Sequence, residues 1–142
     1  MMKKQLSALA LAAATATAAL GGNSEPGSLL VFPFFDSTAG QATIVTVTNT
    51  NSDTSYDPAY GRQRGAIDVE YRYIDGITCA EFNRVEKLTA NDTLQVLVPA
   101  HNSSSQVGYL YVFAVRNSKP VSFNYLTGEL RHFDMIRTTE FG

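Results

Sequence analysis

The stretch AIDVEYRYID, residues 66–75, decides the fold class of this 142-residue chain. Apolar or aromatic side chains alternate in it with charged ones: Ile67, Val69, Tyr71 and Tyr73 against Asp68, Glu70 and Arg72. A period of two is typical of a β-strand with one face in a hydrophobic core and the other in water. The pair Asp75-Gly76 that follows favours a tight turn. The sequence therefore predicts a strand that ends in a turn near residue 75.

Further stretches are rich in the β-branched and aromatic residues that suit strands. They are SLLVFPFF (28–35), QATIVTVTNTN (41–51), TLQVLVP (93–99), GYLYVFAV (108–115) and VSFNYLTG (121–128), and residues 129–142 have room for one more strand. Pro33 cannot donate a ladder hydrogen bond, so its strand is predicted at a sheet edge. In the strand predicted over 41–51, Val45 and Val47 are expected to point to the same face. Residues 108–115 are apolar on both faces, which predicts a central strand.

The segment 79–93 is predicted to be an irregular edge segment or a short helical turn, because Phe82, Val85 and Leu88 recur at helical spacing over a short span. Short strands separated by turn signals favour antiparallel sheets. The predicted fold is all-β, an antiparallel β-sandwich of immunoglobulin-like or similar architecture. Tyr109, near the start of its strand, would suit the corner tyrosine of such a sandwich.

The first residues, MMKKQLSALALAAATATAALGG, have the three-part layout of a secretory signal peptide. Lys3 and Lys4 form a basic start, an apolar run follows, and small residues offer a cleavage site. The run is too short and too rich in Thr for a membrane anchor. The predicted organisation is a signal peptide over 1–21, a flexible linker over 22–27 and one β-sandwich domain over 28–142. The last residues leave open that this domain is truncated at its C-terminus.

The charge balance narrows the classes of partner. The chain has 11 Lys and Arg against 13 Asp and Glu, a net charge of −2, and loss of the two leader lysines lowers it to about −4. Scattered basic residues and a net negative charge argue against nucleic-acid binding and against an anionic lipid surface. No second apolar stretch is long enough to span a bilayer. We expect a protein exported to the periplasm, the cell surface or the medium, and the short two-lysine leader indicates a bacterial source.

Three stretches carry a resemblance that covers most of the predicted mature chain: IVTVTNTN (44–51), VEYRYIDGITCAEFN (69–83) and LTANDTLQVLVPAHN (88–102). In these the chain resembles uncharacterised secreted bacterial proteins with a β-sandwich domain. The resemblance implies an exported domain and brings no catalytic residues with it.

Catalytic chemistry has little support in the sequence. His101 lies near Asp92 and near Ser103, Ser104 and Ser105, but sequence neighbours in one loop rarely converge as a nucleophile and its base. Asp68, Glu70, Glu81 and Glu86 could supply paired carboxylates for glycosidic cleavage, yet the first two share a predicted wet face with Arg72. Aromatic platforms for sugars are also unsupported, since the chain has no Trp and its tyrosines at 71, 73, 109 and 111 are expected in the core. No catalytic or cofactor-binding residue is therefore predicted, and the protein is expected not to be an enzyme.

Calcium is the one ion with a candidate site. In NTNSDTSYD the oxygen-bearing residues Asn49, Asn51, Asp53, Ser55 and Asp57 stand at every second position. Such oxygens are the ligands that calcium takes. Thr54 and Tyr60 stand where an EF-hand needs Gly and Glu, which excludes that motif. The alternatives are an irregular calcium loop, with Asn49, Asn51, Asp53 and Asp57 as ligands, and a plain turn.

Cys79 is the only cysteine. Exported proteins usually pair their cysteines, so three interpretations stay open. Cys79 is a buried free thiol that packs as a small apolar residue, it pairs with a cysteine of another chain, or its mate lies in a continuation of this chain.

Two classes of function follow. The first is an exported structural or binding module that displays a β-sandwich to a protein or surface ligand. Strand exchange between copies is a variant of it, because residues 28–35 follow a flexible linker. The alternative is a secreted hydrolase or carbohydrate-binding accessory domain, with the loop AHNSSS (100–105) or the loop 49–57 as its site.

Overall fold

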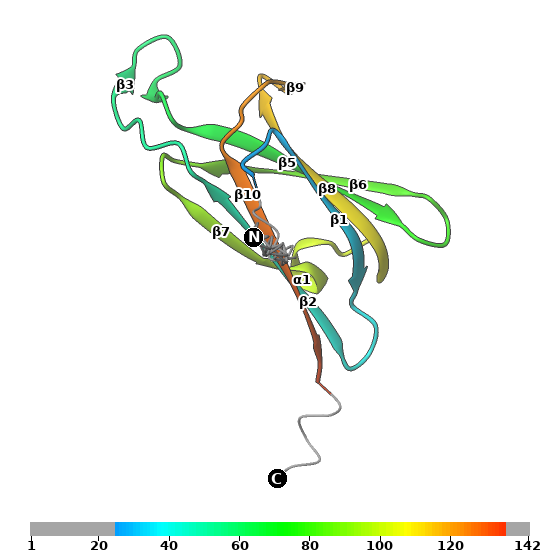
Figure 1. Cartoon of the computed structure of the whole chain (residues 1–142). Helices are drawn as coiled ribbons and strands as arrows, with labels where there is room; N and C mark the ends of the chain where they lie inside the picture. The colour runs from blue at the N-terminus through cyan, green and yellow to red at the C-terminus, as the bar shows by residue number, and fades with distance from the viewer. Residues whose placement is uncertain (1–24, 136–142) are drawn as a thin grey trace, which may run out of the picture.

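The computed structural model describes residues 25–135, so the predicted signal peptide over 1–21 and the residues beyond 135 lie outside the described part of the chain (Figure 1). In chain order the elements are β1 (Leu29–Asp36), β2 (Gln41–Asn49), β3 (Tyr56–Asp57), β4 (Arg62–Gln63), β5 (Ile67–Asp75), β6 (Glu81–Leu88), β7 (Thr93–Leu97), α1 (Val98–His101), β8 (Val107–Arg116), β9 (Lys119–Pro120) and β10 (Leu126–Asp134). Every pair of neighbouring strands is antiparallel. The described chain is all-β, as predicted. Among its residues no helix is long and apolar enough to cross a membrane.

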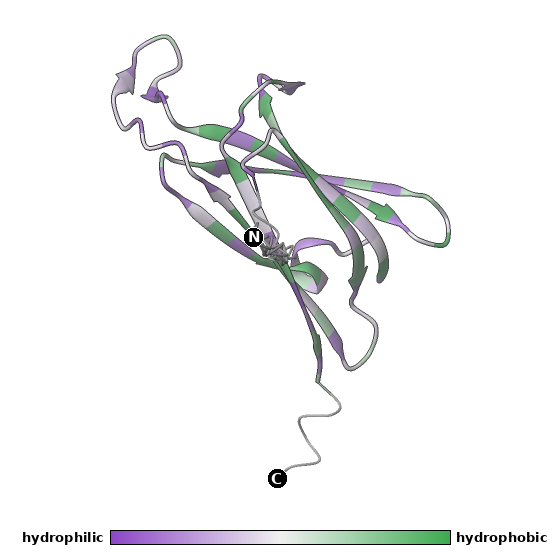
Figure 2. Cartoon of the chain, in the orientation of Figure 1, coloured by the Kyte–Doolittle hydropathy of each residue, from purple (hydrophilic) through white to green (hydrophobic). Residues whose placement is uncertain are grey.

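The strands form two main sheets. One has the order β1-β8-β5-β6, with the short β9 also on β8, and the other has the order β10-β2-β7. The sheets lie in two layers, while the β3–β4 hairpin stands apart at one end (Figure 1). Hydrophobic residues run along both layers, and the hairpin is largely hydrophilic (Figure 2). One cluster of buried side chains joins Val45 and Val47 of β2 to Val69 of β5 and Leu110 of β8, an arrangement that fits a β-sandwich.

Four strand predictions are confirmed. In β5 the side chains of Ile67, Val69, Tyr71 and Tyr73 are fully buried, as the alternation requires. In β2, Val45 and Val47 share one face, as predicted, and both are fully buried. The strand β8 lies between β1 and β5 and is therefore central, whereas β1, which contains Pro33, is an edge strand.

The prediction for residues 79–93 is wrong in its secondary structure and right in its place at an edge. Residues 81–88 form the strand β6, which pairs with β5 from Ile74↔Glu81 to Ile67↔Leu88. The turn at Asp75-Gly76 folds this segment back on β5, and the ladder overrides the helical spacing of Phe82, Val85 and Leu88. Residues 121–125 are likewise outside strands, and β10 begins at Leu126.

The prediction that Tyr109 and Tyr111 belong to the core is wrong. Leu110, Val112 and Ala114 take the inward face of β8 and are fully buried, so their neighbours point outward. Tyr109 is 43% exposed, and Tyr111 is half-buried. A strand can be central and apolar on both faces while only one face is covered. Tyr109 therefore does not have the buried position of a corner tyrosine.

Candidate functional site

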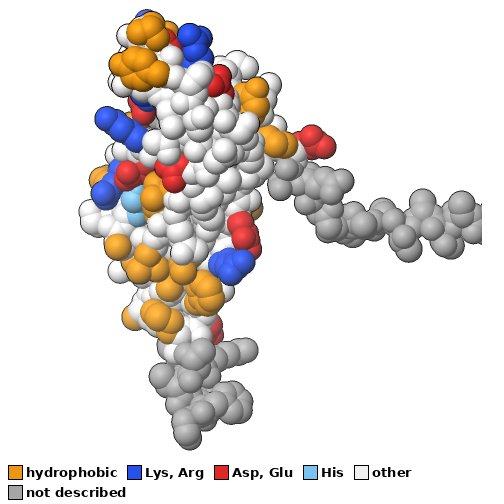
Figure 3. Space-filling model, turned by 90° about the vertical axis from the view of Figure 1, so that its left-hand side faces the viewer, with side chains coloured by type: hydrophobic (Ala, Val, Ile, Leu, Met, Phe, Trp, Pro, Cys, Tyr) orange, Lys and Arg blue, Asp and Glu red, His pale blue; other side chains and the backbone are white. Residues whose placement is uncertain are grey.

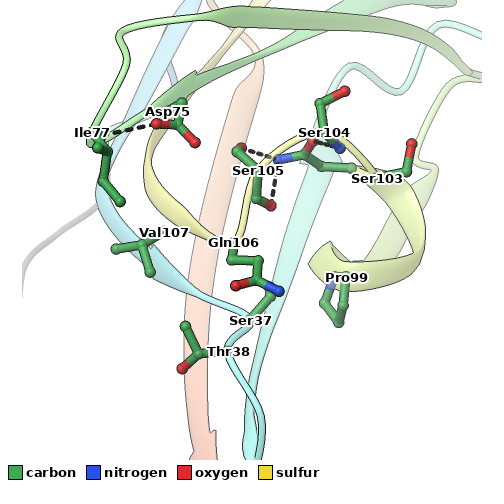
Figure 4. A pocket seen from close by; sticks show the side chains of 11 residues that line it. Ser37, Thr38, Asp75, Ile77, Pro99, Ser103, Ser104, Ser105, Gln106 and Val107 are labelled. Atoms are coloured by element: carbon green, nitrogen blue, oxygen red, sulfur yellow. Dashed lines mark hydrogen bonds between the residues drawn. The ribbon is translucent and has the colours of Figure 1, made fainter.

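A cleft of about 570 Å³ lies where three connections meet at one end of the sheets (Figure 4). They are the β1–β2 turn, the β5–β6 turn and the loop between α1 and β8. Backbone hydrogen bonds hold them together: Ser37 N donates to Gln106 O at 2.7 Å, and Gly76 N donates to Val107 O at 2.8 Å. Because β1, β5 and β8 are neighbours in one sheet, the ladder brings distant parts of the sequence to one site.

The lining of the cleft is polar and almost uncharged. Hydroxyl and amide side chains dominate it: Ser37, Thr38, Asn102, Ser103, Ser104, Ser105 and Gln106. Ile77, Pro99 and Val107 add small apolar areas, and Asp75 is the ionisable member of the lining. Hydroxyls and amides both donate and accept hydrogen bonds, so this surface suits a ligand rich in neutral polar groups.

Asn102 shapes the serine-rich wall of the cleft. It is 2% exposed and follows the single turn of α1, whose first turn contains Pro99. Its Nδ2 donates to Ser105 Oγ at 2.8 Å, and its Oδ1 accepts from Ser104 N at 3.0 Å. The bond from Ser104 N closes an Asx turn, and the two bonds together fix the loop with Ser103 and Ser104 exposed.

The Asp75 carboxylate accepts its hydrogen bonds from within its own turn. Its Oδ1 accepts hydrogen bonds from Thr78 N at 2.7 Å, Ile77 N at 2.8 Å and Thr78 Oγ1 at 3.1 Å. The backbone donors at Thr78 and Ile77 hold the pKa of the Asp75 carboxyl below its usual value. Asp75 therefore stays ionised at neutral pH and is a poor proton donor, and its charge disfavours anions near the cleft.

One hydroxyl in the cleft has no partner. The Oγ atom of Ser37 is inaccessible to solvent and makes no hydrogen bond within residues 25–135. Buried polar atoms are nearly always paired, so an unpaired one needs an explanation. Because this atom is closed to solvent, it is not available to a ligand or a water in the cleft.

His101 does not line this cleft, although it directly precedes Asn102, which does. His101 is 7% exposed. Its Nδ1 is 2.7 Å from Tyr73 Oη, and its Nε2 is 3.1 Å from Glu86 Oε1. Its ring also contacts Tyr71 edge-on, with the centroids 4.8 Å apart. The serines that follow His101 in the sequence line the cleft instead.

The convergence of Tyr73, His101 and Glu86 has the composition of a nucleophile, a base and an orienting group. The hydroxyl, however, belongs to a fully buried tyrosine, and burial raises the pKa of Tyr73 well above its usual value. The phenol stays neutral and out of reach of substrate. We interpret the cluster as a hydrogen-bonded link between α1 and the β5–β6 hairpin.

The fold should weaken as the pH falls below about 6.5, and His101 should be a main cause. Burial lowers the pKa of His101, with the hydrogen bond to Glu86 opposing and the charge of Arg84 adding to the effect. Because the folded state takes up this proton less readily than the unfolded state, the free energy of unfolding decreases as the pH falls below about 6.5.

Urea unfolding at about pH 7.5 and pH 5.5 should show a smaller loss of stability for His101→Gln than for the native protein. His132→Gln, at an exposed histidine, is the control and should keep the full loss. An equal loss in all three proteins would contradict the assignment.

The carboxylates considered for glycosidic cleavage are held in ion pairs. Asp68 pairs with Arg62 at 2.8 Å, and Arg72 bridges Glu70 at 2.7 Å and Glu81 at 3.1 Å. Glu86 forms an ion pair with Arg84 at 3.0 Å and a hydrogen bond with His101. They lie on β5 and β6, and none of the four lines the polar cleft.

The predicted calcium ligands cap their own turns. Asn49 is fully buried at the end of β2, and its Nδ2 donates to Gly65 O at 2.7 Å and to Thr89 O at 2.8 Å. The Oδ1 atoms of Asn49, Asn51, Asp53 and Asp57 each accept from the backbone N–H two residues further on, at 3.0 Å. The side-chain and backbone hydrogen bonds from Ser55 also lower the pKa of Asp53.

These contacts are those of consecutive Asx turns. Within residues 25–135 no three His, Cys, Asp or Glu side chains gather in a group that could hold a metal ion. Asparagine and backbone oxygens can also bind calcium, so the calcium loop stays a prediction.

Cys79 is exposed, which makes the interpretation as a buried thiol wrong. It lies in the β5–β6 turn with a φ of 59°, and its N–H donates to Asp75 O at 3.0 Å. Pairing with a cysteine of another chain or of a continuation of this one stays a prediction.

On the face shown in Figure 3, the charged side chains do not form a patch of a single sign. There, acidic and basic side chains are interspersed, and hydrophobic ones gather at the top and in the lower part. No family model, curated protein or solved structure matches this chain, so the function is inferred from its own geometry.

Proposed function

We propose that this chain is an exported β-sandwich binding module whose polar cleft takes an uncharged, polyhydroxylated ligand, for which a neutral oligosaccharide is the model. The observation that carries the proposal is the lining of the cleft. It presents hydroxyls and amides from three connections, and its one ionisable side chain, Asp75, is engaged in its own turn. Such a lining can hold a neutral ligand in a fixed orientation and supplies no proton-transfer group.

The sandwich is of an immunoglobulin-related kind. Two strand pairs match that fold. In one sheet β2 is the neighbour of β7, and in the opposite sheet β5 is the neighbour of β8. The end strands are exchanged relative to it, because β1 lies beside β8 and β10 beside β2. Loops cluster at the ends of such sandwiches and are common ligand sites, which supports the cleft as the binding end. Export to the periplasm, cell surface or medium rests on the leader sequence.

A secreted hydrolase is the alternative, and it depended on His101. The burial of His101 against Tyr73 and Glu86 removes the side chain that would act as its base. A carbohydrate-binding accessory domain, the other form of this alternative, is compatible with the polar cleft. The serines of the loop 100–105 then contribute as hydrogen-bonding groups.

Removing the amide of Gln106 should weaken binding of a neutral hexose oligosaccharide about tenfold, since one ligand hydrogen bond is worth about 1–1.5 kcal/mol. Gln106 lines the cleft and is exposed, so Gln106→Ala should not affect folding. Affinities are measured by titration calorimetry against a panel of such oligosaccharides. Gln95→Ala is the matched control, because Gln95 is also exposed and lies in β7 of the other sheet.

Anionic oligosaccharides should bind more weakly than neutral ones, because Asp75 places a negative charge on the wall of the cleft. Equal effects of both glutamine substitutions, or tighter binding of the anionic panel, would refute the cleft as the site of a neutral ligand.

A further inference from the structure

A single helical turn joins the buried interior to the polar cleft. The helix α1 ends at His101, which is 7% exposed, and the next residue, Asn102, is 2% exposed. The His101 ring is hydrogen-bonded to β5 and β6, whereas the Asn102 amide is hydrogen-bonded to Ser104 and Ser105 of the cleft. Neighbouring Cα atoms stay about 3.8 Å apart, so His101 cannot leave the interior without moving Asn102. We call residues 102–106 the serine-rich wall.

The partners of the His101 ring fix where its proton lies. The carboxylate of Glu86 can only accept, so the proton of the neutral ring is on Nε2, which donates to Glu86 Oε1 at 3.1 Å. The atom Nδ1 then accepts from Tyr73 Oη at 2.7 Å. A second proton, on Nδ1, makes this atom a donor, and Tyr73 Oη can accept from it only if its own hydrogen turns away. Tyr73 is fully buried and makes no other hydrogen bond among the described residues, so that hydrogen is left without a partner.

The surroundings of the ring decide how readily it takes the second proton. The ionisable side chains around it are Tyr71 and Tyr73 of β5 and Arg84 and Glu86 of β6. The strands β2 and β7, which also contact α1, contain no ionisable residue. Burial lowers the pKa of His101, the charge of Arg84 adds to this effect, and the hydrogen bond to Glu86 opposes it. Protonation therefore weakens the hold of the interior on this ring.

The segment that carries His101 can move without breaking a sheet. The strand β7 ends at Leu97 and β8 begins at Val107, so residues 98–106 take part in no ladder. Outside the ladders of the described chain, one backbone hydrogen bond ties this segment to another element, from Ser37 N to Gln106 O. Segments with few such bonds open at a lower free energy than the whole fold. Release of the His101 ring therefore loosens the serine-rich wall before the sheets come apart.

We propose that His101 is a positioning residue for the polar cleft. Its neutral ring holds the serine-rich wall in the binding arrangement, and its protonated ring leaves the interior and releases the wall. The module then holds its ligand at neutral pH and gives it up in a mildly acidic medium, below about pH 6.5. This inference rests on the proposed function, since the serine-rich wall is part of the cleft assigned to the ligand.

Nuclear magnetic resonance of the ligand-free protein tests the positioning role, in a titration from about pH 7.5 to about pH 5. The amide of Ser104, which donates to Asn102 Oδ1, should shift with the same midpoint as the His101 ring. The amide of Val69, in the core strand β5, should show no transition at this midpoint, because the sheets stay folded.

Three variants separate His101 from other groups. His101→Gln keeps a neutral side chain and should remove the shift of Ser104. Glu86→Gln removes the negative charge that favours the second proton, so the midpoints of His101 and Ser104 should move together to lower pH. His132→Gln, at the other histidine of the chain, is the matched control and should change neither midpoint.

The binding probe is a neutral hexose oligosaccharide. The native protein should bind it at least about fivefold more weakly at about pH 5 than at about pH 7.5, because a shift of one pKa unit is worth about tenfold. The affinity of His101→Gln should change less than about twofold over the same range.

Three results would overturn the positioning role: a Ser104 amide that stays still while the His101 ring titrates, a Val69 amide that moves at the same midpoint, or a native shift of Ser104 in His101→Gln. A protein in which Ser104 follows His101 but which binds no oligosaccharide supports the positioning role and refutes the proposed ligand.

Discussion

Replacing Phe35 by alanine should lower the free energy of unfolding by about 3–5 kcal/mol, whereas the same change at Phe34 should cost about 1 kcal/mol or less. The two residues are neighbours in β1, but Phe35 is fully buried and Phe34 is 45% exposed. The Phe35 ring packs edge-on against Tyr73, with the centroids 5.6 Å apart. Its loss leaves a cavity in the shared core of the two sheets.

A β-bulge decides which of the two phenylalanines is inside. Phe32 pairs with Leu110 and Phe35 with Gly108, so β1 has one more residue than β8 between these pairs. The extra length lies at Pro33 and Phe34, where the ladder is interrupted and the missing N–H of Pro33 does no harm. Without the bulge, strict alternation from Phe32 would place Phe34 in the core and Phe35 in water.

Urea unfolding followed by circular dichroism measures both variants, because the chain has no Trp to serve as a fluorescent probe. Phe34→Ala is the matched control, since it removes the same atoms from the same strand. Phe34 does contact His132, at a centroid distance of 5.7 Å, which accounts for a small expected cost. Equal costs at both positions, or a larger cost at Phe34, would mean that the bulge is wrongly placed.

The bulge also shows what the sequence could predict about this fold and what it could not. In β5 the inward residues Ile67, Val69, Tyr71 and Tyr73 alternate with polar ones, so period-two reasoning finds its buried face correctly. In β2 the inward face also includes the polar Thr43 and Asn49 beside Val45 and Val47. In β1 both faces are apolar and the register is broken, and periodicity alone cannot locate the break. In β6 only Leu88 is buried, because an edge strand at the side of a sandwich has little core to face.

The site was harder to predict than the fold, for a physical reason. Its lining comes from residues 37–38, 75–77 and 99–107, which are joined only by the order of the strands in the sheet. The serine-rich loop drew attention in the sequence as a possible site, and it does line the cleft. His101 drew the same attention but is turned inward by the single turn of α1. The composition of a loop indicates polarity, whereas the direction of each side chain depends on tertiary contacts.

Gly108 lies where β5 and β8 approach each other closely at this end of the sheet. It lies in β8 between Phe35 of β1 and Asp75 of β5, next to Val107, which lines the cleft. A Cβ atom at this position would stand 1.9 Å from Ile74 O and 3.0 Å from Gly76 N. Both neighbours are backbone atoms in a paired strand and its turn, so the clash cannot be relieved by rotating a side chain. The strand β5 must move away from β8 or the ladder between them must break.

Gly108→Ala should therefore cost about 3 kcal/mol or more in urea unfolding. It should also weaken ligand binding in molecules that still fold, because Asp75 and Val107 of the cleft flank the displaced backbone. Gly27→Ala is the control: its Cβ would come no closer than 3.4 Å to Leu29 O, and the change should stay within about 1 kcal/mol of neutral. The same substitution thus has very different costs at the two glycines, because at Gly108, unlike Gly27, the missing side chain makes room for a neighbouring strand. A Gly108→Ala protein as stable as the native one would show that β5 and β8 do not approach each other as closely as this register requires.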